Sequence, residues 1–376
     1  MRKIRVVHII DDLGAGGAQR QLVELLLGAD QEYFDHRVCS LSSERAARAQ
    51  LLADRGFAIA YVAQRGRLDL PAGVRLLRYL RANRPEIVQT WLFTADLYGR
   101  VTARLSRAPV VISSVRSTDP AKPRHHVWAD RLLDHWTDRF IVNARSVGQR
   151  LEERERVDPG RIVVIYNGVD TVRFARGGDP TAVRKNLGWS RNHEVVGFVG
   201  RMRPEKRADL FVSAAARVHA RRPSARFLIV GGGPEQGSVE RQIDDLGLGR
   251  VVAIIPFQLD VVPVFRALDV LVSPSDFEGC SNVILEAMAS RVPVVATDVG
   301  GNRELIGETD GRLVPANDPA ALADMVEETL ADPQGRRARA ASAERRARDQ
   351  FSLERMVGEH EALYRELLDH RGSSAT

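Results

Sequence analysis

The sequence predicts an α/β protein in which two doubly wound parallel sheets follow one another along the chain. Short apolar runs rich in valine and isoleucine alternate with amphipathic stretches almost without a break. These runs show little alternation of polar and apolar residues, which is typical of strands buried on both faces of a parallel sheet covered by helices. The length of 376 residues is too long for one ordinary domain and comfortable for two.

Strand candidates occur in both halves, and amphipathic segments such as Ala18–Leu27 and Leu70–Asn83 are predicted as helices between them. The first-half strand candidates are Ile4–Ile10, His36–Leu41, Ala58–Val62, Ile87–Trp91, Val110–Val115, Arg139–Val142 and Ile162–Ile165. The second-half candidates are Val195–Val199, Arg226–Val230, Val251–Ile255, Val270–Val272 and Pro293–Thr297.

A polar stretch with Gly177, Gly178 and Pro180 separates the two halves and is the best linker candidate. The expected order is a first domain over residues 1–170, a linker over 171–190, a second domain over 191–352 and a helical segment over 353–376.

The net charge of +6 and a pI near 9.7 favour anionic partners such as nucleotides, nucleic acids or anionic lipid surfaces, although a generally solvated basic surface has the same composition. The two cysteines, Cys39 and Cys280, are too few for a disulfide framework and indicate a reducing compartment. No apolar stretch approaches the ~20 residues of a membrane span. We therefore expect a cytoplasmic protein whose contact with a membrane is at most peripheral.

Doubly wound sheets bind ligands beyond the carboxyl ends of their strands, so the loops that follow strands are the candidate sites. After the first strand, Gly16 and Gly17 belong to a glycine-rich turn that opens a helix, where phosphate is attracted. The spacing departs from the dinucleotide fingerprint because Gln19 takes the place of its last glycine, and a tight turn without a ligand explains it equally well.

In the second half, Arg201 and Lys206 flank the loop after the first strand, where a guanidinium and an ammonium can clamp a pyrophosphate. Such a pair is also found simply solvated on surfaces. The next strand ends in three glycines centred on Gly232, which permit close approach of a base or a phosphate, or form a flexible turn.

The strongest feature follows the strand that stops at Pro274: a loop carries Glu278, and a helix begins near Ser281 or Asn282 with Glu286 about one turn inside it. Free N–H groups at a helix start form an anion site, and carboxylates beside it can bind hydroxyl groups. A glutamate early in a helix is also favourable for the helix dipole alone. The amides that we assign to the anion site belong to Gly279, Cys280, Ser281 and Asn282.

Taken in order, these loops resemble the motifs of glycosyltransferase family 4, a large group of retaining enzymes with the GT-B fold. Glu278 and Glu286 resemble its E-x7-E motif, and Arg201 with Lys206 its donor clamp. Three further segments resemble its N-terminal loop, its hinge entry and the loop after the E-x7-E helix, namely Gly16–Arg20, Tyr166–Asp170 and Thr297–Glu304. The similarity extends over nearly the whole chain.

The resemblance implies two Rossmann-like domains facing across a cleft, with the final helix crossing back onto the first domain. It implies transfer of a hexosyl or N-acetylhexosaminyl group from a UDP- or GDP-sugar to a glycan or lipid-linked glycan in envelope or exopolysaccharide synthesis. No cofactor, metal ion or nucleic acid is expected, and the chain lacks the D-x-D motif of metal-dependent glycosyltransferases.

The resemblance also assigns roles to the candidate residues. Arg201 and Lys206 bind the diphosphate and stabilise it as it departs, Glu278 holds the donor sugar with the neighbouring amides, and Glu286 binds the ribose. Gly16 and Gly17 face the phosphates from the other domain.

One position departs from the family pattern, because Arg116 stands where members often carry a histidine near the reacting sugar. Arg116 can support the acceptor or the leaving group, or be an ordinary loop arginine. Two alternatives stay open. The GT-B fold also serves nucleotide-sugar epimerases, and the departure at Arg116 supports a catalytically silent nucleotide-sugar-binding subunit.

The stretch 122–136 contains Trp128, Leu132 and Trp136 at four-residue spacing among basic residues that include Lys122. A basic helix with tryptophans can lie on an anionic membrane. We expect instead a stripe that faces the core. The acidic residues Asp130, Asp134 and Asp138 also weaken the membrane interpretation.

Overall fold

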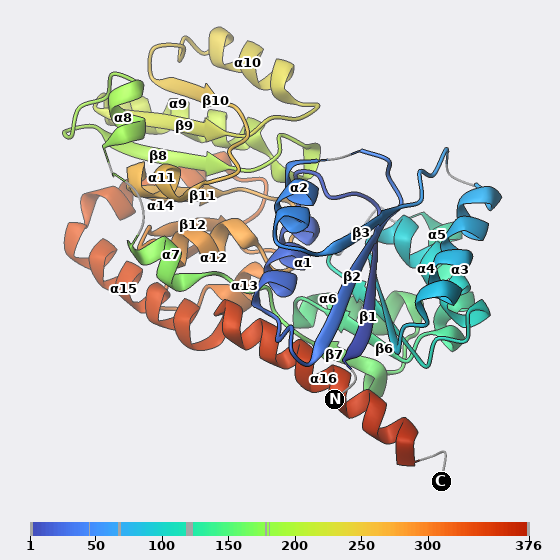
Figure 1. The fold of residues 1–376 in the computed structure, drawn as a ribbon. Helices are drawn as coiled ribbons and strands as arrows, with labels where there is room; N and C mark the ends of the chain where they lie inside the picture. Colours follow the sequence, from blue (N-terminus) through green and yellow to red (C-terminus); the bar gives the residue numbers. More distant parts are fainter. Residues whose placement is uncertain are drawn as a thin grey trace. The chain divides into compact units, whose positions relative to one another are not determined.

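The computed structural model describes residues 3–44, 46–66, 69–117, 123–176, 179 and 181–373, and it divides into two compact units. The first unit comprises Met1–Gly168 with Leu353–Thr376, and the second comprises Val169–Ser352. Each unit is a parallel sheet with helices on its faces, as the sequence predicts (Figure 1). None of the helices in the described part of the chain is both long and apolar enough to cross a membrane.

Within the described residues, the first unit has a parallel sheet of seven strands in the order β3-β2-β1-β4-β5-β6-β7. The strands are β1 (Ile4–Ile10), β2 (Phe34–Ser40), β3 (Ala58–Tyr61), β4 (Ile87–Trp91), β5 (Val110–Val115), β6 (Arg139–Val142) and β7 (Ile162–Val164). The side chains of the five inner strands are mostly buried on both faces of the sheet, which is why these strands read as continuous apolar runs, whereas the edge strands β3 and β7 are only partly buried.

Helices α1, α2 and α16 pack on one face of this sheet, and α3 and α4 pack on the opposite face. On one face Leu22 and Leu26 of α1 pack in one core with Met356 and Tyr364 of α16, and on the other face α3 and α4 form a separate core. The helices of this unit are α1 (Gly17–Gly28), α2 (Ala47–Asp54), α3 (Leu70–Asn83), α4 (Phe93–Leu105), α5 (Arg124–Leu133), α6 (Arg145–Arg150) and α16 (Leu353–Ser373), with the short helices η1 (Asp134–Trp136), η2 (Leu151–Glu155) and η3 (Pro159–Arg161).

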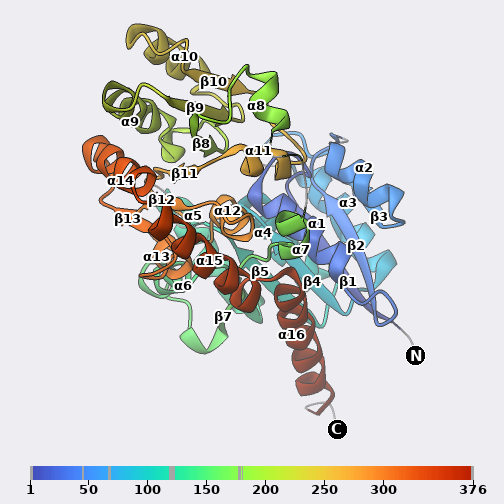
Figure 2. The same ribbon diagram turned by 90° about the vertical axis from the view of Figure 1, so that its left-hand side faces the viewer.

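The described residues of the second unit form a parallel sheet of six strands in the order β10-β9-β8-β11-β12-β13. Helices α9 and α14 pack against each other on one face (Figure 2), and α12 packs against α7 and α15. The strands are β8 (Glu194–Val199), β9 (Ala225–Val230), β10 (Val252–Ile255), β11 (Val270–Ser273), β12 (Val294–Thr297) and β13 (Arg312–Val314). The helices are α7 (Thr171–Arg176), α8 (Ala182–Asn186), η4 (Pro204–Lys206), α9 (Ala208–Arg221), α10 (Gln236–Asp245), α11 (Val262–Ala267), α12 (Asn282–Ala289), α13 (Asn302–Leu305), α14 (Pro319–Ala331) and α15 (Pro333–Gln350).

The stretch 171–190, which we expected to be a linker, belongs to the second unit and holds α7 and α8. Its Phe174 is fully buried against Phe265, with ring centroids 5.9 Å apart, so an apolar anchor ties the polar stretch to the unit. Gly177, Gly178 and Pro180 lie outside the described residues. The final helix α16 belongs to the first unit, where the Tyr364 hydroxyl donates a hydrogen bond to Gln89 of β4.

The expectation that the stripe on α5 and η1 faces the core is wrong. Trp128, Leu132 and Trp136 are 64%, 53% and 40% exposed. The four-residue spacing of the three apolar residues identified the stripe, but it could not tell which face of the helix packs on the domain. Lys122, at the start of this basic stretch, lies outside the described residues.

Candidate functional site

The candidate residues of the second unit gather where the strand order of its sheet reverses. Strand β8 pairs with β9 on one side and with β11 on the other, so the chain leaves β8 in opposite directions to build the two halves of the sheet. The loops after β8, β9 and β11 therefore lie side by side at the carboxyl edge. This switch point is where ligands bind in open α/β sheets.

Lys206 and Glu278, which are far apart in the sequence, meet at this edge. The Lys206 Nζ lies 2.5 Å from Glu278 Oε1, and the Ser275 hydroxyl donates to the same oxygen at 2.8 Å. Glu278 is buried while Lys206 is half-buried. Both side chains are thus held in fixed positions beside one another, and Arg201 is exposed in the same loop as Lys206.

Backbone and side-chain contacts hold the loop after β11 against the loop after β8. The Asp276 N–H donates to the Glu205 carbonyl at 2.9 Å, and the Arg207 guanidinium pairs with Asp276 at 3.0 Å. The carbonyl of Glu278 accepts from the Gly301 N–H at 3.1 Å. These contacts fix the backbone that carries Glu278. Arg207 and Asp276 were not predicted as site residues, because no local sequence pattern shows that these two side chains come together.

The glycines after β9 have a packing role that the sequence did not reveal. A Cβ atom on Gly231 would lie 2.0 Å from the Gly200 carbonyl oxygen, and one on Gly233 would lie 2.3 Å from the Met202 oxygen. These two glycines let the loop after β9 approach the loop that carries Arg201. At Gly232 a Cβ would meet only the Gln236 side chain, at 3.4 Å, so Gly232 is the member of the trio with space beside it.

The second glutamate lies on α12, which begins at Asn282 with Ser281 as its N-cap residue. Glu286 is buried on this helix, one turn from its start, as the sequence predicts. Cys280 and Ser281 are also buried, while Asn282 is half-buried. The first turn of α12 and Gly279 therefore lie at the same sheet edge as Glu278.

In the first unit, Gly16 is the N-cap residue of α1 and Gly17 is its first residue. Asp12 Oδ1 accepts hydrogen bonds from the Gly14 N–H at 2.7 Å and from the Gln19 amide at 3.1 Å. Gln19, the residue that breaks the dinucleotide fingerprint, thus holds the glycine turn in place. An aspartate two residues before a glycine was the signal for this turn.

Arg116 follows β5 at the carboxyl edge, and its guanidinium lies 4.8 Å above the ring of Trp91. The buried His360 ring is stacked with the same indole, with centroids 6.4 Å apart and planes within 9°. Arg116 is therefore more than an ordinary loop arginine, because it packs as a cation on an aromatic face. Its neighbours Thr118 and Asp119 lie outside the described residues.

Sequence analysis missed Asp11, which directly follows β1. Its carboxylate accepts from the Ala95 N–H at 2.5 Å, at the start of α4. Burial raises the pKa of Asp11 to about 6, and the backbone hydrogen bond from Ala95 opposes this rise. An acidic residue at the end of a first strand was the available signal, but its burial could not be foreseen.

Two sequence models of known families match the chain. The model described as Glycosyltransferase Family 4 matches residues 15–173, and the model described as Glycosyl transferases group 1 matches residues 193–332. Together the matches extend over most of both units. The chain belongs to glycosyltransferase family 4.

Curated relatives of this family-4 member include two bacterial proteins named D-inositol 3-phosphate glycosyltransferase. The protein from Geodermatophilus obscurus is 36% identical over 258 residues, which cover 65% of this chain and 56% of the relative. The protein from Salinispora tropica is 32% identical over 282 residues, which cover 70% of this chain and 58% of the relative. The chain thus spans less than two thirds of the length of these relatives.

Solved structures of similar fold include Anabaena Alr3699/HepE in complex with UDP and glucose, with a TM-score of 0.88. It is 20% identical, and the match covers 96% of this chain and 100% of that one. WaaG, a glycosyltransferase involved in lipopolysaccharide biosynthesis, has a TM-score of 0.77 at 16% identity, with 96% of this chain and 99% of that one covered. These similarities establish the GT-B fold for the family-4 chain.

The family-4 chain was expected to work without a metal ion. In the part of the chain that the structure describes, no group of three or more His, Cys, Asp or Glu side chains is placed to hold one. Arg201 and Lys206 are cations that the loop after β8 brings to this edge. Metal independence stays a prediction.

Proposed function

We propose that this family-4 member is a retaining glycosyltransferase that moves a hexosyl or N-acetylhexosaminyl group from a UDP- or GDP-sugar to a glycan or lipid-linked glycan. The observation that carries the proposal is the contact between Lys206 and Glu278 at the switch point of the second sheet. A phosphate-binding cation and a hydroxyl-binding carboxylate side by side fit a sugar joined to a diphosphate. The fold shared with an UDP-bound protein supports it.

In the proposed reaction Arg201 and Lys206 hold the diphosphate and stabilise the negative charge that grows as it leaves. Glu278 accepts hydrogen bonds from the sugar hydroxyls, and Glu286 accepts them from the ribose. The bond from the anomeric carbon to the phosphate oxygen breaks, and a bond to the acceptor oxygen forms on the same face. The acceptor proton passes to the departing diphosphate. The two cations supply the charge that a metal ion supplies elsewhere, so neither metal nor cofactor is required.

The proposed setting is the cytoplasmic face of the plasma membrane, in envelope or exopolysaccharide synthesis. WaaG is described as a glycosyltransferase involved in lipopolysaccharide biosynthesis, which supports an envelope setting. The curated relatives are named instead for D-inositol 3-phosphate, which is an acceptor of a different kind. Nucleic acid is not among the proposed partners. The protein would reach a lipid-linked acceptor by peripheral contact with the bilayer.

A catalytically silent subunit is the second candidate. It is favoured by the presence of Arg116 where family members often carry a histidine. Its guanidinium rests on Trp91, an arrangement that serves packing as well as catalysis. A silent subunit binds the nucleotide sugar without turning it over. An epimerase of this fold, by contrast, would convert the sugar without an acceptor.

The deciding experiment measures binding and slow hydrolysis of a panel of UDP- and GDP-sugars in the presence of EDTA. We expect one donor to bind and to be hydrolysed, and Glu278→Ala and Arg201→Ala to abolish turnover. Arg221→Ala is the matched control, because Arg221 pairs with Asp324 and Glu327 on the outer helices of the same unit. Binding without turnover would favour the silent subunit. The proposal is refuted if the wild-type chain binds none of the donors in the panel.

A further inference from the structure

An apolar stripe of three large side chains is exposed on the α5–η1 segment of the first unit. Trp128, Leu132 and Trp136 recur every four residues, so Trp128 and Leu132 lie on one side of α5 and Trp136 follows them in η1. Their exposed fractions of 64%, 53% and 40% contrast with the fully buried Trp91 of the same unit. Leu105 is 54% exposed at the end of α4, a helix that packs against both α5 and η1. Large apolar side chains exposed on neighbouring elements often mark an interaction surface.

The acidic residues that weakened a membrane interpretation are turned toward arginines of other elements. Asp130 is buried and pairs with the buried Arg100 of α4. Asp134 pairs with Arg161 of η3 at 3.1 Å. Both carboxylates are therefore engaged by arginines on the side of the helix that packs on the unit. The apolar stripe lies on the exposed side of this segment.

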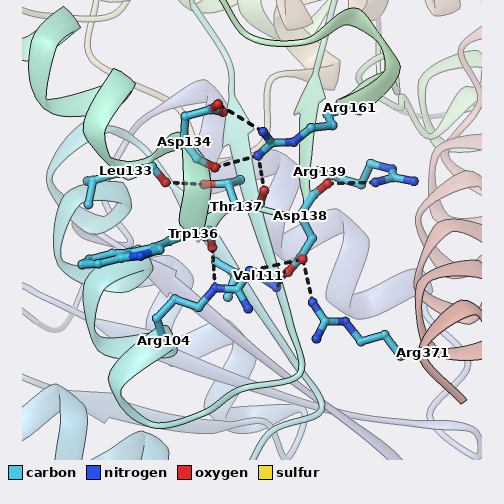
Figure 3. Close-up of polar contacts among 10 residues, drawn as sticks. All are labelled: Arg104, Val111, Leu133, Asp134, Trp136, Thr137, Asp138, Arg139, Arg161 and Arg371. Atoms are coloured by element: carbon cyan, nitrogen blue, oxygen red, sulfur yellow. Dashed lines mark hydrogen bonds and ion pairs between the residues drawn. The ribbon is translucent and has the colours of Figure 1, made fainter. Parts of the chain in front are cut away.

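The third acidic residue, Asp138, is held between two arginines. Its carboxylate accepts from Arg104 at 3.2 Å and from Arg371 of α16 at 2.7 Å (Figure 3). Arg104 also donates from Nε to the Trp136 carbonyl at 3.0 Å, so the same side chain fixes the end of the stripe. Two arginines thus face one carboxylate, which leaves one positive charge in excess next to Trp136.

The surroundings of the stripe carry more positive than negative charge. Exposed Arg107 and Arg131 are matched by the exposed Glu152 and Glu153 of the neighbouring η2. The surplus is the one positive charge that Arg104 and Arg371 leave at Asp138. Arginine stems can lie along apolar surface while their charged heads reach lipid phosphates. Tryptophan is favoured at the same depth of a bilayer, because its ring contacts the acyl chains while its indole N–H can bond to water or headgroups.

We propose that the α5–η1 stripe, defined by Trp128, Leu132 and Trp136, docks the first unit on the surface of an anionic lipid bilayer. A second copy of the chain fits less well, because a symmetric contact would place the same arginine surplus on both sides. The inference gives a location to the peripheral contact included in the proposed function. Its test measures lipid binding rather than sugar transfer, so the two proposals can fail separately.

The test is flotation of the full chain with vesicles of phosphatidylcholine alone or with phosphatidylglycerol added. We expect binding to the anionic vesicles, weaker binding at high salt, and a partition coefficient about tenfold lower for Trp128→Ser/Trp136→Ser. Leu246→Ser is the matched control, because Leu246 is 46% exposed at the end of α10 in the other unit and should leave binding unchanged. Circular dichroism and thermal melting verify that both variants fold.

Two further readouts keep the proposal falsifiable if the double variant unfolds. Arg131→Glu should weaken binding to anionic vesicles, and brominated lipids should quench the fluorescence of the wild-type chain, since Trp128 and Trp136 would enter the bilayer. The proposal is overturned if wild-type binding ignores phosphatidylglycerol, or if Trp128→Ser/Trp136→Ser binds as tightly as the wild type. It is equally overturned if the stripe proves to mediate a dimer, seen as a mass change of that variant in light scattering with lipid binding intact.

Discussion

The Lys206 ammonium lies 2.5 Å from the Glu278 carboxylate, and the Ser275 hydroxyl bonds to the same carboxylate oxygen. The two charged groups come from the loops after β8 and β11, which meet where the strand order reverses. Each group positions the other. A change of either one should therefore disturb both the phosphate side and the sugar side of the proposed donor site.

Glu278→Gln should lower kcat/KM for donor hydrolysis about ten- to a hundredfold, because it removes a charged acceptor but keeps the shape of the side chain. Ser275→Ala should have a smaller effect, since it removes only a supporting hydrogen bond to Glu278. Steady-state kinetics with the donor found in the panel gives both values. Glu240→Gln, on the exposed side of α10, is the control and should keep full activity. Unchanged kinetics in Glu278→Gln would remove Glu278 from the site.

Gly231→Ala should destabilise the second unit by about 1–3 kcal/mol and abolish donor binding. The added Cβ would lie 2.0 Å from the Gly200 carbonyl, and backbone must move to relieve the clash. The φ of +137° at Gly231 also disfavours any side chain. Gly237→Ala is the matched control, because nothing lies within 4 Å of its added Cβ, and a helical alanine is favoured there. Urea unfolding of both variants tests the difference, and equal stability would show that the loop has room to relax.

The fold could be predicted because buried parallel strands and amphipathic helices leave a strong local pattern. Ile4–Ile10 and Leu70–Asn83 were predicted with the bounds that β1 and α3 have in the structure. The polar linker was predicted less well, because Phe174 is a single apolar anchor within a stretch whose composition resembles a loop. One buried ring is enough to attach such a stretch to a domain.

The candidate site was predictable as a set of loops but not as a set of contacts. Parallel strands bring the loops that carry Lys206 and Glu278 to one edge, and the sequence contains that information. The direction of the Trp128 stripe depends instead on where Asp130 finds a partner, and Arg100 lies on another helix. The burial of Asp11 likewise depends on packing against α4, which no local pattern encodes.

The stability of the first unit should fall as the pH drops from about 6.5 toward 4. His8, His36 and His360 are buried near one another, and His8 Nε2 lies 2.9 Å from His36 Nδ1. Burial lowers the pKa of His36 to about 4 and that of His360 to about 3, and it also lowers the pKa of His8. Between these pKa values and the ordinary 6.5, the chain takes up protons when it unfolds. Each such histidine therefore lowers the free energy of unfolding by about 1.4 kcal/mol for each unit that the pH falls.

Asp11 opposes this trend, because its raised pKa of about 6 makes the folded chain bind a proton that the unfolded chain releases above 3.8. Burial raises the pKa of Asp96 as well, so Asp96 acts in the same direction as Asp11. Two carboxyl groups do not outweigh three histidines. Urea unfolding between pH 4.5 and 7.5, a range chosen around these pKa values, should show a positive slope of stability with pH. His360→Phe should reduce the slope, whereas the exposed His370→Phe should not. A slope that is zero or negative would mean that the histidines are not buried in solution.

Arg100→Met should destabilise the first unit by about 3–5 kcal/mol, the usual cost of breaking a buried ion pair. The guanidinium is 1% exposed and contacts Asp96 at 2.5 Å as well as Asp130, so its removal leaves two carboxylates in a buried place. Burial already raises the pKa of Asp96, although Arg100 opposes the rise, and the variant should raise it further. The loss of stability should therefore be smaller at low pH, where both carboxyl groups can take up protons. Because Asp130 anchors α5, the variant should also weaken vesicle binding through the Trp128 stripe, whereas Arg221→Met, which breaks an exposed pair, should change neither property.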